Sequence, residues 1–147
     1  MTGEGLVRDL CESLGLNDRD PKTLPGLTLA YVGDCVFEIV VRSALVEKGL
    51  NHVSELNKIA TRTVSAKAQS AYMKTIEETL EPDEKDAFRR GKNANSTSIP
   101  KSATRVEYHT ATGFEALMGY LFLQGKTDRV LELCHPLLEE LIIKKKG

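Results

Sequence analysis

"LAYVGDCVFEIVVR", residues 29–42, is an apolar stretch that holds a glycine and an aspartate in its middle. Its composition predicts a buried helix, in which Gly33 costs about 1 kcal/mol relative to alanine. Asp34 adds a second cost, because a carboxylate near Leu29 and Ile39 must lose its water unless something binds it. A helix that keeps both residues therefore needs an explanation for them.

The chain on either side of this stretch is also predicted to be helical. Thr28 is a candidate N-cap for a helix that stops at Gly49, and Pro82 can open a short helix because proline suits the first turn. Pro136 is expected to kink or divide the last helix. After Gly91 about twenty residues show no helical period, and so long a loop is uncommon in a compact domain. The helices are expected over residues 4–14, 28–48, 55–80 (capped by Ser54), 82–90, 112–125 and 127–143.

The composition is typical of a soluble globular protein. The chain has 147 residues, of which 41% are hydrophobic and 28% are charged. No apolar run approaches the ~20 residues needed to span a membrane, and the N-terminal stretch lacks the layout of a signal peptide. Three widely spaced cysteines imply neither a disulfide framework nor a zinc ribbon. We therefore expect a single all-α domain over residues 1–147, without internal repeats, in the cytoplasm.

The distribution of charge is more informative than the net charge of −1, which comes from 20 basic and 21 acidic residues. A neutral balance argues mildly against a nucleic-acid-binding protein. From Lys85 to Arg105, however, six residues are basic and only Asp86 is acidic, which predicts a local basic patch. Arg89 and Arg90 also have a simpler explanation, because cations stabilise the negative end of a helix dipole.

Two carboxylates are candidates for chemistry. If Asp34 and Glu115, each in an apolar helix, face one cleft, they would attract a divalent cation that prefers oxygen ligands, Mg²⁺ or Mn²⁺. Each residue also has a simpler explanation. Asp34 fits an exposed stripe with Glu38 and Arg42 at i,i+4 spacing, and Thr112 with Glu115 fits a capping box.

Four blocks of the sequence follow one another in a recognisable order. They are "LTLAYVGDCVFEIVVR", "ATRTVSAKAQ", "RRGKNANS" followed by "PKSA", and "TGFEALMGYLFL", over about residues 24–125. Together they resemble Mini-ribonuclease III, the small bacterial relative of the ribonuclease III catalytic domain. The resemblance implies an all-α homodimer that cleaves double-stranded RNA with Mg²⁺, or Mn²⁺ as an alternative. It also implies maturation of the large-subunit (23S) ribosomal RNA precursor, with a large-subunit ribosomal protein as a further partner.

The resemblance assigns roles to individual residues. Asp34 falls on the aspartate of the family's Gly-Asp signature and Glu115 on the glutamate of its second motif, so both are expected to hold the metal and support catalysis. Larger ribonuclease III enzymes carry two further acidic residues, where this chain has Ala30 and Thr112. Tyr31 falls where related enzymes insert an aromatic side chain into the other subunit.

RNA contacts are expected from the basic region, since no separate double-stranded-RNA-binding domain follows the last helix. Such side chains bind backbone phosphates and recognise A-form RNA by its shape. The alternative function is a non-catalytic RNA-binding or ribosome-associated helical dimer of the same fold. The absence of two acidic residues that larger ribonuclease III enzymes carry would be consistent with this alternative. The residues expected to contact RNA are Arg89, Arg90, Lys92, Asn93 and Lys101.

Overall fold

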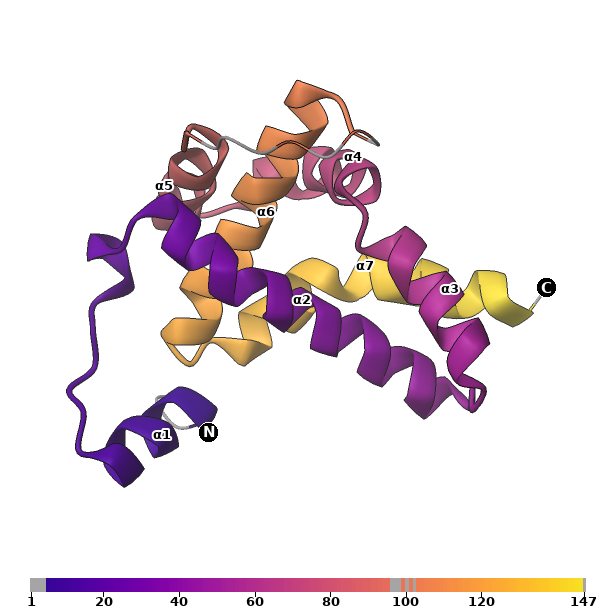
Figure 1. Cartoon of the computed structure of the whole chain (residues 1–147), viewed down its shortest axis with the longest axis horizontal. Coiled ribbons are helices and arrows are strands. Elements are labelled where there is room, and N and C mark those ends of the chain that lie inside the picture. Colours follow the sequence, from indigo (N-terminus) through magenta and orange to yellow (C-terminus); the bar gives the residue numbers. More distant parts are fainter. Residues whose placement is uncertain (1–4, 96–98, 100, 102, 147) are drawn as a thin grey trace.

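The fold is all-α, as predicted (Figure 1). A computed structural model describes residues 5–95, 99, 101 and 103–146, and these contain helices and no strand. No helix in this part of the chain is both long and apolar enough to cross a bilayer. The α-helices are α1 (Leu6–Leu14), α2 (Gly26–Lys48), α3 (Val53–Thr63), α4 (Ala66–Ile76), α5 (Pro82–Lys92), α6 (Arg105–Leu123) and α7 (Thr127–Lys146), with 3-10 turns η1 (Pro21–Thr23) and η2 (Glu77–Thr79).

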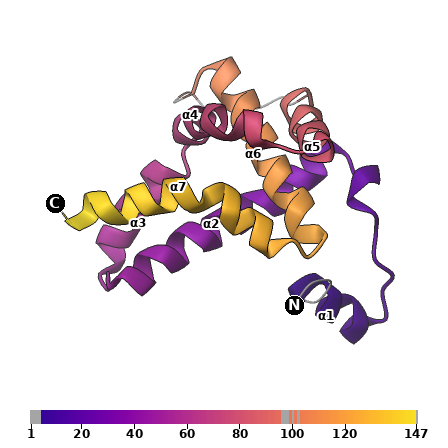
Figure 2. The same ribbon diagram turned by 180° about the vertical axis from the view of Figure 1, so that it is seen from behind.

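Helix α6 forms the centre of the core, and α2, α4 and α5 pack around it (Figures 1 and 2). A helix that is apolar on all sides requires such cover, and Phe114, Leu117 and Leu121 of α6 are fully buried. Phe114 meets Phe37 of α2 edge to face, with 4.9 Å between ring centroids. Helix α1, by contrast, has no buried residue and lies at the edge of the molecule.

The predicted C-terminal end of α2 is confirmed, but its predicted N-cap is wrong. The helix ends at Gly49 as predicted, and the φ of 119° at this residue is one that side chains other than glycine rarely adopt. It begins at Gly26, after Pro25, so Thr28 lies inside the first turn and is not the N-cap.

The single helix predicted over residues 55–80 is wrong. The chain forms α3 and α4, with Val64 and Ser65 between them, and α4 ends four residues before the predicted end. Ser65 is the N-cap of α4, since its hydroxyl accepts a hydrogen bond from the amide of Ala68 at 3.2 Å. The predicted cap, Ser54, lies within the first turn of α3, which His52 precedes.

The capping box predicted at Thr112 and Glu115 is also wrong. Helix α6 begins at Arg105, and the box is formed by Thr104 and Glu107, whose side chains bond each other's backbone amides at 3.0 Å. Thr112 lies inside the helix and donates to the carbonyl of Tyr108 at 2.9 Å. The predicted long loop is therefore shorter, and Glu115 needs another explanation.

The remaining helix boundaries are close to those predicted. Pro82 opens α5, which continues one residue past Gly91 to Lys92. Helix α7 continues through Pro136 to Lys146, so the proline does not divide it. Helix α1 covers Leu6–Leu14 of the predicted 4–14, and residue 4 lies outside the described residues.

Candidate functional site

Helices α2 and α6 cross in backbone contact at two glycines. A Cβ atom built on Gly33 would lie 1.6 Å from the carbonyl oxygen of Glu115, and one on Gly119 would lie 2.0 Å from the carbonyl oxygen of Leu29. Real Cβ contacts shorter than 3.0 Å essentially never occur. Only glycine is compatible with this crossing at either position, which explains why α2 retains Gly33 despite its low helix propensity.

The crossing brings two carboxyl groups together. Asp34 follows Gly33 directly, and its side chain shares a hydrogen bond with that of Glu115. Burial, and then the negative charge of Asp34, raise the pKa of Glu115 well above its usual range. Two carboxylates this close repel each other unless a proton or a cation lies between them.

Asp34 itself is exposed, so the prediction that it loses its water among apolar neighbours is wrong. Ile39, one of those neighbours, is 61% exposed. Desolvation acts on Glu115, which is partly buried. The surface-stripe explanation applies to the next turn, where Arg42 and Glu38 form an ion pair at 2.9 Å, while Asp34 interacts with Glu115.

A third polar side chain reaches the site from α4. Gln69 is 1% exposed, and its Nε2 donates to the carbonyl of Val64 at 3.0 Å. The same side chain hydrogen-bonds to Glu115, which favours the ionised carboxylate. Its Oε1 is buried and has no hydrogen-bond partner among the residues that the structure describes. Gln69 was not among the predicted site residues, although it lies in the quoted block "ATRTVSAKAQ".

The residues present fit a hydrated divalent cation. Within the described residues no three His, Cys, Asp or Glu side chains gather at one point, so Asp34 and Glu115 would be the only acidic ligands. Mg²⁺ binds well in such a site because it takes oxygen ligands and keeps several waters. Ala30 and Thr112 are buried, and the Thr112 hydroxyl already bonds within its own helix. The orphaned Oε1 of Gln69 is a buried acceptor that a water of the cation's shell could satisfy.

The predicted RNA-contacting residues divide into two groups. Arg89 is exposed beside Asp86, and Lys92 is exposed with its Nζ 5.7 Å from the centre of the Phe88 ring. Asn93 and Lys101 are also exposed. Arg90 differs, because only 24% of its side chain is exposed.

Arg90 is occupied with holding the fold together. Its Nε donates to Asp86 at 3.1 Å, and its Nη1 donates to the carbonyl of Leu24, just before α2. The guanidinium therefore ties the end of α5 to the start of α2, and we do not include it in the RNA surface proposed below.

Tyr31 lies on α2 three residues before Asp34, and 80% of it is exposed. Packing into the core of its own chain, the simpler explanation for a tyrosine, is thus excluded. A large exposed aromatic side chain beside a candidate site is a feature typical of a surface that contacts another molecule.

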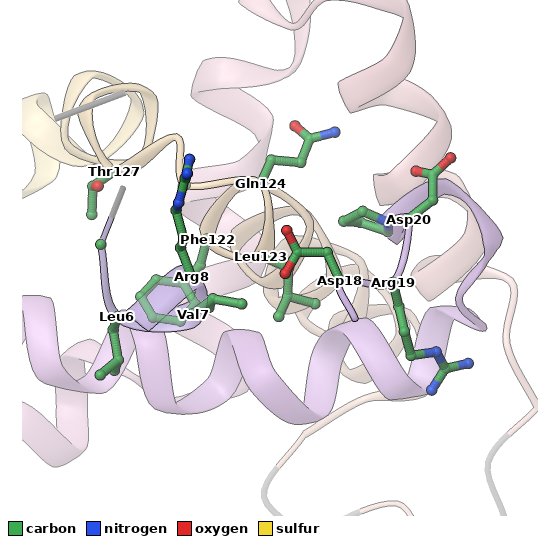
Figure 3. A pocket seen from close by; sticks show the side chains of 13 residues that line it. Leu6, Val7, Arg8, Asp18, Arg19, Asp20, Phe122, Leu123, Gln124 and Thr127 are labelled. Atoms are coloured by element: carbon green, nitrogen blue, oxygen red, sulfur yellow. The ribbon is translucent and has the colours of Figure 1, made fainter. Parts of the chain in front are cut away.

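A separate pocket lies away from the carboxylates, between α1, the segment 18–20 and the turn from α6 to α7 (Figure 3). Leu6, Arg8, Phe122 and Gln124 are among the residues that line it. Asp20, at its edge, accepts a hydrogen bond from the amide of Lys22 at 3.0 Å and caps η1. This pocket includes neither Asp34 nor Glu115.

Comparison with known proteins identifies relatives of the chain. The family model of the Ribonuclease III domain matches residues 27–126. The Mini-ribonuclease 3 of Symbiobacterium thermophilum is 46% identical over 114 residues, which are 78% of this chain and 88% of that protein. The Mini-ribonuclease 3 of Enterococcus faecalis is 45% identical over 134 residues, which are 88% and 96% of the two chains. A crystal structure of a protein from Fusobacterium nucleatum has a TM-score of 0.76 at 33% identity, covering 83% of this chain and 99% of that one.

Proposed function

The chain belongs to the ribonuclease III family and acts as an endoribonuclease, and from this premise we propose that it cleaves double-stranded RNA with Mg²⁺ held by Asp34 and Glu115. The observation that carries the proposal is the meeting of these two carboxyl groups at the crossing of α2 and α6. The non-catalytic alternative is not retained, because the family match and the relatives named Mini-ribonuclease 3 favour an enzyme.

The chemistry follows from the geometry of the chain. Mg²⁺, when bound, supplies an activated water and stabilises charge on the phosphate. Asp34 is exposed and accessible to a cation from solvent, whereas Glu115 is partly buried and interacts with neighbouring side chains. The two helices fix the backbone positions of both residues before RNA arrives, because their main chains touch.

The substrate we propose is structured RNA, including the precursor of large-subunit (23S) ribosomal RNA, processed in the cytoplasm. The resemblance to Mini-ribonuclease III supports this substrate, and it supports a large-subunit ribosomal protein as a further partner. The direct test is to incubate the purified protein with a double-stranded RNA and with the ribosomal RNA precursor, each with Mg²⁺ and with a chelator. Cleavage of neither RNA in Mg²⁺ would overturn the proposal.

We propose that Tyr31 is part of a symmetric dimer interface. A symmetric interface buries the same patch on both subunits, and truncating a buried aromatic anchor weakens association by about 2 kcal/mol, or roughly 30-fold in Kd. Tyr31→Ala should therefore contain more monomer in light scattering while keeping its helical circular dichroism. The matched control is Val106→Ala, which removes another exposed apolar side chain, from α6. If Tyr31→Ala dissociates no more than this control, the interface lies elsewhere.

We propose that Arg89 and Lys92, with Asn93 and Lys101 nearby in sequence, bind RNA phosphates. Each phosphate contact adds about 0.9 to the slope of log affinity against log salt, by analogy with B-DNA. The double variant Arg89→Ala/Lys92→Ala should bind all duplex sequences more weakly and flatten that slope by up to about two units. A salt titration of binding in Ca²⁺ without Mg²⁺ measures it.

The control for this titration removes two charges from another part of the surface. Lys58 and Arg62 are exposed on α3. Helix α3 lies beside the C-terminal end of α2, whereas α5 lies near the N-terminal end of α2 (Figures 1 and 2). Lys58→Ala/Arg62→Ala should leave the slope unchanged. Equal flattening in both double variants would show that net charge, not this end of α5, governs binding.

A further inference from the structure

Gln69 is the most deeply buried polar side chain in contact with the candidate site. It is 1% exposed on α4, a helix that carries neither candidate ligand. Helix α4 packs against α6, so the Gln69 side chain reaches Glu115 from a neighbouring helix. A long amide in such a position, in contact with a carboxylate, points to a role in the site as well as in the fold.

We propose that Gln69 is a positioning residue, which fixes the Glu115 carboxylate for the cation and offers Oε1 to the cation's water shell. This inference rests on the proposed function, since it assumes a cation at Asp34 and Glu115. It adds a third helix, α4, to a site otherwise formed by α2 and α6.

The hydrogen-bonding capacity of the amide supports this role. A glutamine Nε2 carries two hydrogens. Here Nε2 donates to the Val64 carbonyl at 3.0 Å, and the same side chain interacts with the Glu115 carboxylate and favours its ionised form. Val64 lies in the link between α3 and α4, so this hydrogen bond connects the Gln69 side chain to that link. Partners of this kind orient metal ligands, and their loss typically weakens metal binding by 10- to 100-fold.

The unused oxygen of the amide supports the second half of the proposal. Nε2 donates to the Val64 carbonyl, yet Oε1 is buried and accepts no hydrogen bond from the described residues. Buried amide oxygens nearly always have a donor. A water bound to the cation is such a donor, and Mg²⁺ and Mn²⁺ sites retain several waters.

A purely structural role for Gln69 makes a different prediction. If the amide only ties the α3–α4 link to α4, its loss lowers the melting temperature and leaves metal affinity unchanged in the folded protein. The two roles are therefore separated by measuring metal binding without RNA, well below the melting temperature of each variant.

The experiment is a titration of the whole chain with Mn²⁺ alone, followed by the electron paramagnetic resonance signal of free Mn²⁺. Gln69→Met keeps side-chain volume and removes the amide, and we expect it to weaken Mn²⁺ binding by about 10-fold or more. The control is Ser70→Ala, which alters the next buried polar side chain of α4 and should bind like the wild type. If Gln69→Met fails to fold, Gln69→Asn, one methylene too short to span both partners, should show the same loss.

A double-mutant cycle tests whether Gln69 acts through Glu115. Adding Gln69→Met to Glu115→Gln should weaken Mn²⁺ binding less than it does in the wild type. Wild-type affinity in Gln69→Met or Gln69→Asn, while Asp34→Asn has lost binding, would overturn the Gln69 inference alone. A wild-type protein that binds no Mn²⁺, or binds it as Asp34→Asn does, would overturn the proposed metal site and this inference with it.

Discussion

Asp34→Asn is expected to lower the rate of RNA cleavage by a factor of about 1,000 or more while leaving the fold and RNA binding intact. The amide is nearly isosteric with the carboxylate but is neutral, so it is a poor ligand for Mg²⁺. Asp34 is exposed, so the substitution leaves no buried group without a partner. Glu115→Gln should behave similarly and recover some activity at high metal concentration, since one carboxylate remains.

Cleavage of a double-stranded RNA under limiting Mg²⁺ measures this effect, with duplex binding in Ca²⁺ and circular dichroism as parallel readouts. The matched control is Glu38→Gln, which neutralises another carboxylate of α2, one turn further on and paired with Arg42. It should cleave at nearly the wild-type rate. Near wild-type cleavage by Asp34→Asn would show that the metal is held elsewhere.

Gly33→Ala is expected to destabilise the protein by about 3 kcal/mol or more, at the upper end for overpacking. The added Cβ would lie 1.6 Å from the Glu115 carbonyl oxygen, which belongs to backbone and cannot rotate away. The helices must separate, and this outweighs the ~1 kcal/mol that alanine gains over glycine in helix propensity. Gly119→Ala should behave in the same way, since its Cβ meets the Leu29 carbonyl.

Urea denaturation of the purified variants measures this loss. Ser43→Ala provides the control, because Ser43 is exposed on α2. Alanine at this position raises helix propensity and does not bring a Cβ atom against a neighbouring helix. It should match or exceed wild-type stability. If Gly33→Ala lies within about 1 kcal/mol of wild type, the helices do not cross in backbone contact.

Local signals in the sequence predicted much of the fold. Gly49 ends α2 and Pro82 begins α5, because each residue restricts its own backbone. The start of α6 was misplaced because two capping-box patterns, eight residues apart, fit the same sequence. Thr104 with Glu107 forms the box, and the pattern at Thr112 falls inside the helix. Propensity alone does not decide between such competing starts.

The candidate site was predictable only in part. Asp34 and Glu115 were found from their apolar context and from the resemblance, and the structure brings their side chains together. Which of the two is desolvated depends on how α2 and α6 pack, and the local sequence around Asp34 predicted the wrong one. Gln69 was missed because its partner lies 46 positions away in the chain and on another helix. A glutamine in an alanine-rich helix gives no local sign of such a contact.

The backbone contact between α2 and α6 also has a thermodynamic consequence for ligand binding. Sites formed by flexible loops lose conformational entropy when a ligand orders them, and that loss is subtracted from the affinity. Asp34 and Glu115 instead project from helices whose main chains touch at Gly33 and Gly119. When a cation binds, only the rotation of these two side chains remains to be restricted. The helix crossing therefore preorganises the backbone of the site. Modest direct ligation by two carboxylates can then suffice, because little of its free energy is spent on assembling the site.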